Sequence, residues 1–406
     1  MKITPTQTVS ELIDALSFAI DSDGVKNYYH SWRVAVIATE ISRVLVKSQQ
    51  QKIILCAGLL HDVGGVELSH HILNYLKRRD KNSINLLLSH SIIGSQLISN
   101  IHRLNEVANL VLYHHEWVNG TGYPSSKIEK YLPLGSQILR IADSIDIHLR
   151  IRNYVKLGQL KKCMLSNINK EYSEKVFNAA FKALGKSSFF PKVRKLENIP
   201  GLLKDTKNRV GSIEIPHKID AIGRALEVVA QIIDMKHPYS SGHSLRVSRY
   251  ALACSLVLKF THDQTTLIRW AGLIHDIGKI SVSRRILDKP TQLTPREFKE
   301  IRKHASFTAN IMEMIPSLKD IALMASSHHE FFDGSGYPLG LRGEQIPLGS
   351  RILALCDAFD AMTSNRPYRN PLTPKAACAE IDRYSGSQFD PEISKYIIPL
   401  FRHFCI

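Results

Sequence analysis

Apolar side chains recur at spacings of three and four residues through most of the chain, which is the period of an amphipathic α-helix. The pattern is clearest over residues 219–235 and 245–258. An alternation of period two, which is typical of strands, has little support. Thr294 and Pro295, followed by Glu297, predict an N-cap with proline in the first turn of a helix. We therefore predict an all-α fold.

The same succession of short motifs occurs twice along the chain, and such a repeat reveals the domain plan before any single motif is interpreted. The first copy contains a His-Ser pair (30–31), GLLHDVGG (58–65), HHEWVNGTGYP (114–124) and PLGSQILRIADSID (133–146). The second contains a His-Ser pair (243–244), GLIHDIGK (272–279), HHEFFDGSGYP (328–338) and PLGSRILALCDAFD (347–360). The first pair recurs after 213 residues and every later motif after 214, so almost nothing is inserted between the copies. We predict two tandem domains of one fold, residues 1–200 and 213–406, with the junction in the proline- and glycine-containing segment 197–216.

Composition places the chain among ordinary globular proteins. Its 406 residues, 44% of them hydrophobic and 22% charged, exclude collagenous, low-complexity and wholly disordered classes. No apolar run reaches the roughly eighteen residues that span a bilayer, and residues 1–10 lack the features of a signal peptide, so we expect a cytoplasmic location without a membrane partner. The six cysteines are scattered, which argues against a disulfide framework and against a thiolate metal site.

The formal net charge of +16 alone would make polyanions candidate partners. However, residues 151–209 hold 14 Lys and Arg against 4 Asp and Glu, and therefore carry +10 of the total. A solvated helix face with a basic linker explains such a run. We therefore do not expect nucleic acid to be a partner.

Histidines and aspartates form the strongest chemical signal. A lone histidine on an apolar helix is usually a packed core residue, but ten of the eighteen histidines recur in register between the copies. Imidazole and carboxylate groups without cysteine suit Mn, Fe or Zn, and two adjacent sets of donors can hold two ions. The aspartate of the His-Asp pair can bridge both ions, with a bridging hydroxide as nucleophile in a displacement at phosphorus. The second copy supplies His243, His275, Asp276, His304, His328, His329 and Asp357, and the first supplies His30, His61, Asp62, His90, His114, His115 and Asp143.

The second copy resembles the HD-GYP phosphodiesterases, a branch of the HD hydrolase superfamily that linearises cyclic dinucleotides. The likeness extends over residues 220–391 and includes HDIGK, KPTQLT, HHE, DGSGYP, GLRGEQIPL, DAFDAMTSNRPYR and FDP. It implies two tandem HD-type helical domains, of which the first is divergent and the second catalytic.

The resemblance also implies roles for individual residues. One metal ion would be held by His243, His275, Asp276 and Asp357, and the other by Asp276, His304, His328 and His329. The catalytic residues would be His275, Asp276 and Lys279, of which Lys279 contacts the scissile phosphate. Substrate would also meet the loop of Gly336, Tyr337 and Pro338 and the side chains of Arg366 and Arg369, with Asp360 nearby. These ligand types do not select among Mn, Fe, Ni and Zn.

Two positions depart from the family pattern. Members that bind a third metal carry a glutamate four residues before the first histidine, where this chain has Tyr239, so we expect two ions. The residue after HHE, which is often basic, is Phe331, and this leaves the identity of the substrate open.

The first copy keeps the metal-ligand pattern but not the phosphate contacts. Gly65 stands at the position of Lys279, and the RPYR and FDP segments are missing, although Arg152 is level with Arg366. Three interpretations are a weak second active site, a regulatory domain that binds metal or ligand, and a packing partner. Because missing phosphate contacts raise a transition state more than they weaken metal binding, we favour a regulatory or structural role.

The leading hypothesis is a phosphodiesterase that converts cyclic di-GMP or 3'3'-cyclic GMP-AMP to a linear dinucleotide in the second domain. One alternative is an HD-type nucleotide phosphohydrolase, against which the GYP and RPYR segments argue. Another is a catalytically weak sensor of cyclic dinucleotides, against which the complete ligand set argues. A homodimer, or a partner bound through the first domain, stays open.

Overall fold

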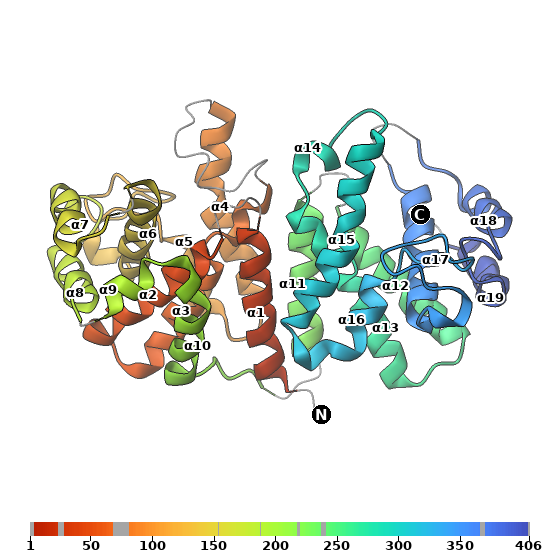
Figure 1. The fold of residues 1–406 in the computed structure, drawn as a ribbon, viewed down its shortest axis with the longest axis horizontal. Coiled ribbons are helices and arrows are strands. Elements are labelled where there is room, and N and C mark those ends of the chain that lie inside the picture. Colours follow the sequence, from red (N-terminus) through yellow and green to blue (C-terminus); the bar gives the residue numbers. More distant parts are fainter. Residues whose placement is uncertain are drawn as a thin grey trace. The chain divides into compact units, whose positions relative to one another are not determined.

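The computed structural model describes residues 4–22, 28–67, 81–152, 154–186, 188–216, 220–236, 241–365 and 370–404. Within these ranges the regular structure consists of helices joined by turns, and no strand forms (Figure 1). The prediction of an all-α fold is therefore confirmed. No helix in this part of the chain is both long and apolar enough to span a membrane.

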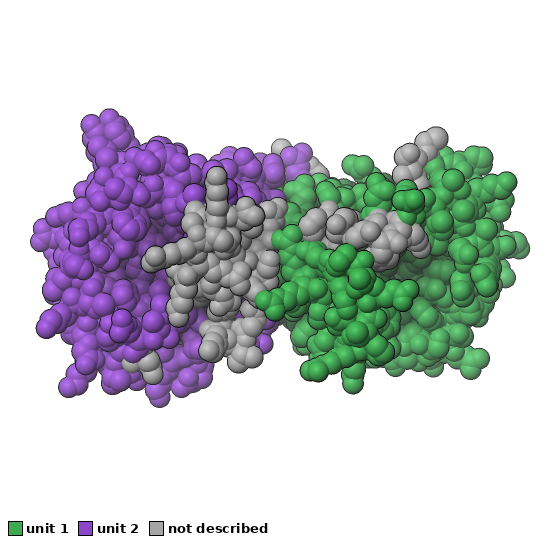
Figure 2. Space-filling model, turned by 90° about the horizontal axis from the view of Figure 1, so that it is seen from above, with its two compact units in different colours: residues 1–3, 225–406 green, residues 4–224 purple. Residues whose placement is uncertain are grey.

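The chain forms two compact units, residues 4–224 and residues 225–406, which are purple and green in Figure 2. The first unit contains α1 (Pro5–Asp21), α2 (His30–Leu45), α3 (Ser48–Leu60), η1 (Val63–Glu67), α4 (Lys81–Ser99), α5 (Asn105–Leu112), α6 (Leu134–Arg152), α7 (Leu157–Met164), α8 (Glu174–Leu184), α9 (Phe189–Val193) and α10 (Ile199–Val210). The second contains most of α11 (Asp220–Met235), then α12 (His243–Val257), α13 (His262–Ile274), η7 (Ile277–Ser281), α14 (Arg284–Leu287), α15 (Pro295–Glu313), α16 (Lys319–Ser326), α17 (Leu348–Thr363), α18 (Pro374–Arg383) and α19 (Pro391–Phe401).

The two units repeat one packing scheme. Helix α2 packs against α3 and α6, and in the second unit α12 packs against α13 and α17. Helix α4 packs against α5 and η1, as α15 packs against α16 and η7. The repeat of motifs along the sequence thus corresponds to a repeat of helix packing.

Local sequence explains where several helices begin. Helix α15 starts after Thr294, whose hydroxyl accepts a hydrogen bond from the backbone N–H of Glu297 at 3.3 Å, while the Glu297 carboxylate accepts from the Thr294 N–H at 2.8 Å. This reciprocal cap satisfies two donors that the first turn leaves without helical partners. Helices α11 and α12 cover the two segments with the clearest apolar periodicity.

The segment expected to join the domains contains a helix. Helix α10 occupies the middle of residues 197–216 and packs against α2 and α3. Pro200 lies in its first turn, and Gly211 follows its last residue with a positive φ of 73°. Proline at a helix start and glycine just past its end are normal helix boundaries as well as linker residues, so the same two residues fit both interpretations of the sequence.

Candidate metal centre

Two groups of histidine and aspartate side chains lie together in residues 225–406. In each group the potential ligand atoms lie within 4.8 Å of one another. One group consists of Asp276, His304, His328 and His329, and the other of His243, His275 and Asp276. Asp357 lies beside the second group, with its Oδ1 3.4 Å from Nε2 of His243. The structure thus gathers all seven side chains, and Asp276 belongs to both groups.

Different helices contribute these side chains. They come from the start of α12 (His243), the end of α13 (His275, Asp276), α15 (His304), the turn after α16 (His328, His329) and α17 (Asp357). The site therefore exists only when the unit is folded, because its members are up to 114 residues apart in the chain.

Backbone carbonyl groups orient three of the imidazoles. The pairs are His275 Nδ1 with Gly272 O at 2.8 Å, His304 Nδ1 with Ile301 O at 2.6 Å and His328 Nδ1 with Ala325 O at 2.7 Å. A carbonyl oxygen can only accept a hydrogen bond, so each Nδ1 carries the proton and each Nε2 keeps its lone pair. Burial lowers the pKa of His328 to about 3, which keeps that imidazole neutral. Fixing one ring nitrogen in this way is typical of histidines that bind metal through the other.

Several of the atoms that face the centre lack a hydrogen-bond partner. In the part of the chain that the structure describes, Nε2 of His304, Nε2 of His328 and Oδ1 of Asp276 are buried without a hydrogen-bond partner. Nε2 of His243 and Nε2 of His275 lie 3.3 Å apart. Buried acceptors are costly unless something satisfies them, and a cation bound among these nitrogens and carboxylate oxygens would do so. The donor set therefore fits divalent transition-metal ions.

A carboxylate behind His243 orients the fourth imidazole. Asp360 accepts a hydrogen bond from Nδ1 of His243 at 2.8 Å and from Nε and Nη2 of Arg246 at 2.6 and 3.0 Å. Burial alone would lower the pKa of His243, but its hydrogen bonds to Asp276 and Asp360 outweigh burial and raise the pKa to about 9. The carboxylates of Asp276 and Asp360 thus favour the protonated form of His243 when no other cation is bound. Asp360 is buried behind His243, and its expected place near the substrate stays a prediction.

The turn after the His-Asp pair is fixed by a close backbone approach. A Cβ atom on Gly278 would lie only 2.0 Å from the carbonyl oxygen of His304, so no larger residue fits without moving α15. The next residue, Lys279, donates a hydrogen bond from Nζ to the carboxylate of Asp276. A quarter of the Lys279 side chain is exposed, so its ammonium lies at the edge of the centre.

The Gly-Tyr-Pro loop is held by a buried glutamate. Glu330 accepts hydrogen bonds from the backbone N–H groups of Leu339 at 2.6 Å and Leu341 at 2.9 Å. Tyr337 stacks on the ring of His329, with centroids 4.9 Å apart and an interplanar angle of 30°. A Cβ atom on Gly336 would lie 2.1 Å from the backbone nitrogen of Phe331. The loop is therefore built into the wall of the centre.

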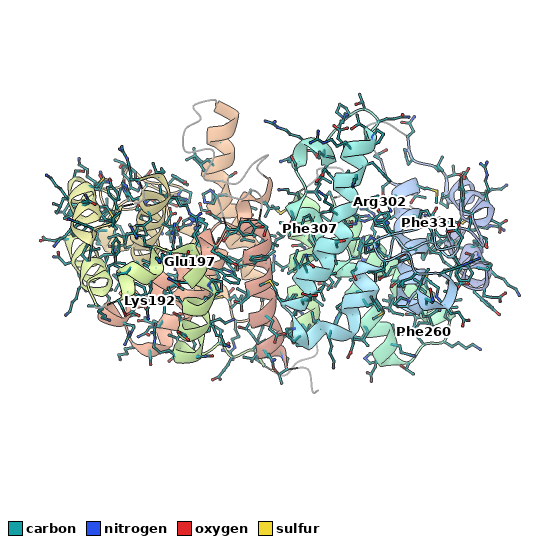
Figure 3. The ribbon with its side chains drawn as sticks, in the orientation of Figure 1. Lys192, Glu197, Phe260, Arg302, Phe307 and Phe331 are labelled. Carbon is teal, nitrogen blue, oxygen red and sulfur yellow. The ribbon has the colours of Figure 1, made fainter. Side chains whose placement is uncertain are left out.

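The side chain of an arginine on α15, for which the sequence predicted no role, packs against this loop. The guanidinium carbon of Arg302 lies 4.3 Å from the centroid of the Tyr337 ring, two residues before His304 on α15. Figure 3 labels Arg302 and Phe331. Arg366 and Arg369 lie outside the described residues, as does Tyr239.

The first unit repeats the arrangement of ligands. Its two groups are Asp62, His90, His114 and His115, and His30, His61 and Asp143. His61 Nδ1 donates to Gly58 O at 2.9 Å, and Asp146 accepts from His30 Nδ1 at 2.7 Å, as Asp360 does from His243. Gly65 supplies no ammonium, and Arg152 is exposed at the end of α6. Matching ligand side chains thus gather in both copies, but the two groups described in the first copy share no residue, and Gly65 replaces the lysine.

No role was predicted from the sequence for three supporting residues, although one of them, Glu330, ends the HHE motif. They are Arg246, Glu330 and Asp234, whose carboxylate accepts from the Ser244 hydroxyl at 2.8 Å and thereby holds the start of α12. The signal that could have identified them is recurrence, since Arg33, Glu116 and Asp21 occupy the matching positions and make matching contacts.

Comparisons with known protein families agree with the repeat. One HD-domain family matches residues 227–393, and a second HD-domain family matches residues 27–147. A crystal structure of a cyclic GMP-AMP-specific phosphodiesterase of Vibrio cholerae superposes with a TM-score of 0.66 over 98% of each chain at 21% identity, so the two chains share a fold.

Curated relatives carry the same kind of domain. The chain is 26% identical to 3'3'-cGAMP-specific phosphodiesterase 1 of Vibrio cholerae, covering 87% of this chain and 83% of that protein. It is 40% identical over 162 residues to 3'3'-cGAMP-specific phosphodiesterase 3 of the same organism and 36% identical over 183 residues to the cyclic di-GMP phosphodiesterase of Thermotoga maritima. It spans only 35% and 50% of those two relatives. With an HD domain matched in each copy and His-Asp and Gly-Tyr-Pro motifs joined at one centre, the chain is a tandem HD-domain protein that is similar to the HD-GYP phosphodiesterases.

Proposed function

We propose that the chain hydrolyses a cyclic dinucleotide, 3'3'-cyclic GMP-AMP or cyclic di-GMP, to a linear dinucleotide at the centre in residues 225–406. The observation that carries the proposal is that two ligand groups share the carboxylate of Asp276, as a two-ion hydrolytic site requires. The names of the curated relatives, which include both specificities, support this class of substrate.

The proposed centre holds two divalent transition-metal ions. His243, His275, Asp276 and Asp357 would hold one ion, and Asp276, His304, His328 and His329 would hold the other. Such ions supply positive charge at the phosphoryl oxygens and a lowered pKa for the attacking water. The protein's contribution is to fix its ligands, through the carbonyl groups behind His275, His304 and His328 and through Asp360 behind His243.

Lys279 is proposed to contact the scissile phosphate. Its ammonium is partly exposed and already lies against Asp276, so a small rotation of a flexible side chain can present it to a phosphoryl oxygen. Negative charge develops on that oxygen in the transition state, where a fixed cation is most effective. Arg302, held against Tyr337, provides a second cation on the same wall.

Catalysis is proposed for the second copy because of the position of Lys279. Gly65 at the matching position of the first copy offers no side-chain donor to a phosphate. We propose that the first domain serves a regulatory or structural role.

Turnover of defined substrates tests the proposal. The purified chain, with Mn(II) or Fe(II) added and oxygen excluded, would be incubated separately with 3'3'-cyclic GMP-AMP, cyclic di-GMP and cyclic di-AMP, and linear products would be separated by chromatography. We expect cleavage that His275→Ala abolishes and that the matched variant His61→Ala leaves nearly unchanged. Equal losses in the two variants would contradict a catalytic second copy.

The same experiment separates the alternatives. Tight binding of a cyclic dinucleotide without turnover, in metal-loaded protein, would identify a sensor. Hydrolysis of nucleoside mono- or triphosphates with intact cyclic dinucleotides would identify a phosphohydrolase. Either outcome would overturn the proposal.

A further inference from the structure

A buried arginine enters the ligand groups of the first copy. Arg140 lies on α6, one turn before Asp143, and its side chain is only 12% exposed. Its Nη1 lies 3.0 Å from Nδ1 of His115 and 3.2 Å from Oδ2 of Asp143. Its Nη2 and Nε lie 3.0 and 3.2 Å from Oε2 of Glu171. One guanidinium thus touches one member of each ligand group.

Among the residues that the structure describes in the second copy, no arginine makes the corresponding contact. Ala354 occupies the equivalent position on α17, one turn before Asp357. The position of Glu171 is taken by Gln388, since Lys170 and Ser387, the preceding residues, accept matching backbone hydrogen bonds at 3.2 and 2.8 Å. The arginine and its glutamate therefore occur as a pair in the first copy and are both replaced in the second.

The hydrogen bond to His115 removes a metal ligand. A guanidinium donates and cannot accept, so Nδ1 of His115 must accept from Arg140. A neutral imidazole has one nitrogen with a free lone pair, and that lone pair is already used. Nε2 then carries the proton, so neither nitrogen of His115 is available to a cation.

The guanidinium also supplies the charge that an ion would supply. An arginine side chain stays protonated in proteins, and this one is paired with the carboxylates of Glu171 and Asp143. Asp143 is paired with this fixed charge at 3.2 Å, and a divalent ion bound next to it would be repelled.

We propose that Arg140 takes the place of a metal ion in the first copy, withdrawing His115 and Asp143 from ligation, so that this copy holds at most one ion. The inference does not depend on hydrolysis, since it concerns metal content. The two copies would then differ in the number of metal ions that they hold, as well as in the phosphate contact that the first copy lacks.

The test compares the chain with the double variant Arg140→Ala, Glu171→Gln, which recreates the residues of the second copy. Both are placed in a His275→Ala, His328→Ala background, which disables the second centre. Each protein is loaded with Mn(II), desalted, and examined by elemental analysis and electron paramagnetic resonance. We expect the double variant to gain about one ion and the multiline signal of two coupled Mn(II) ions, as a two-ion site requires.

Controls keep the outcome interpretable. Arg43→Ala removes an arginine of the same unit whose partner, Glu40, belongs to no ligand group, and should leave metal content unchanged. Circular dichroism and thermal unfolding check that each variant folds. If the double variant does not fold, the reciprocal change Ala354→Arg with Gln388→Glu, made without the background mutations, should lower the metal content of the second centre. A coupled two-ion signal from the first copy with Arg140 in place, or equal metal contents in folded proteins with and without it, would overturn the proposal.

Discussion

Asp360→Asn removes the charge behind His243 while keeping the shape of the side chain. The Asp360 carboxylate accepts one hydrogen bond from His243 and two from Arg246. An asparagine has one acceptor oxygen, and its amide group would face the donors of the imidazole or of the guanidinium. His243 therefore either loses the acceptor that fixes its tautomer or competes with Arg246 for the single amide oxygen.

The expected loss follows from comparable outer partners of metal-binding histidines. Their mutation costs about 10- to 100-fold in metal affinity or activity, which corresponds to about 1.4–2.7 kcal/mol. The matched variant is Asp146→Asn, because Asp146 makes the same contact to His30 in the first unit. There we expect a larger loss of stability, since Arg33 is 3% exposed and Arg246 is 32% exposed, and an unpaired buried charge costs more.

Two measurements separate these effects. Competition with a chelator gives the Mn(II) affinity, and product formation from the preferred cyclic dinucleotide gives turnover. Asp360→Asn should weaken both, while Asp146→Asn should lower the melting temperature and leave turnover unchanged. Unchanged affinity and turnover in folded Asp360→Asn would refute the role of Asp360 in orienting His243.

Three further predictions concern neighbouring features. Gly278→Ala should lower the free energy of unfolding by about 1–3 kcal/mol and release metal, because the added Cβ would lie 2.0 Å from a carbonyl oxygen of α15. The matched variant Gly64→Ala should leave turnover unchanged. Metal titration and kinetics distinguish the two variants. Lys279→Ala should lower kcat by about 10²–10³-fold with metal content unchanged, and loss of metal instead would show that the lysine mainly holds Asp276. Hydrogen bonding from Lys289 lowers the pKa of Glu297 to about 2, so its charge stabilises the fold above the ordinary value of 4.5 and the contribution disappears as the pH falls toward 2. Glu297→Gln should therefore melt below the unchanged protein at pH 7 and converge with it in acid, and a pH-independent difference would contradict this.

Much of the centre was predictable because its residues recur. His275, His304 and Asp357 each have an identical residue 214 positions earlier, and this recurrence separates them from ordinary core residues. The position of Asp360 behind His243 was not predictable, since the contact joins residues 117 positions apart and depends on how α12 crosses α17. The importance of Arg140 was hidden for another reason, because its partner Glu171 lies in a segment without a motif.

The domain boundary shows a different limit. Pro200 and Gly211 are read equally well as parts of a linker or as the two ends of α10. Burial of Ile199 and Leu203 shows that the segment is a packed helix. A local pattern cannot specify which distant surface such side chains will meet.

The hydrogen bonds of the buried glutamate after the His-His pair explain why the Gly-Tyr-Pro sequence can be retained in a domain that does not catalyse hydrolysis. Glu330 and Glu116 each accept hydrogen bonds from two backbone N–H groups just after the Gly-Tyr-Pro sequence, so these contacts stabilise the corner formed by this loop in both copies. Substitutions in this corner would damage folding whether or not the copy turns over substrate. Selection for a stable corner alone would preserve the signature through a loss of catalysis. In a duplicated chain of this kind, the more diagnostic positions are those that no structural role protects, such as Lys279 and its replacement Gly65.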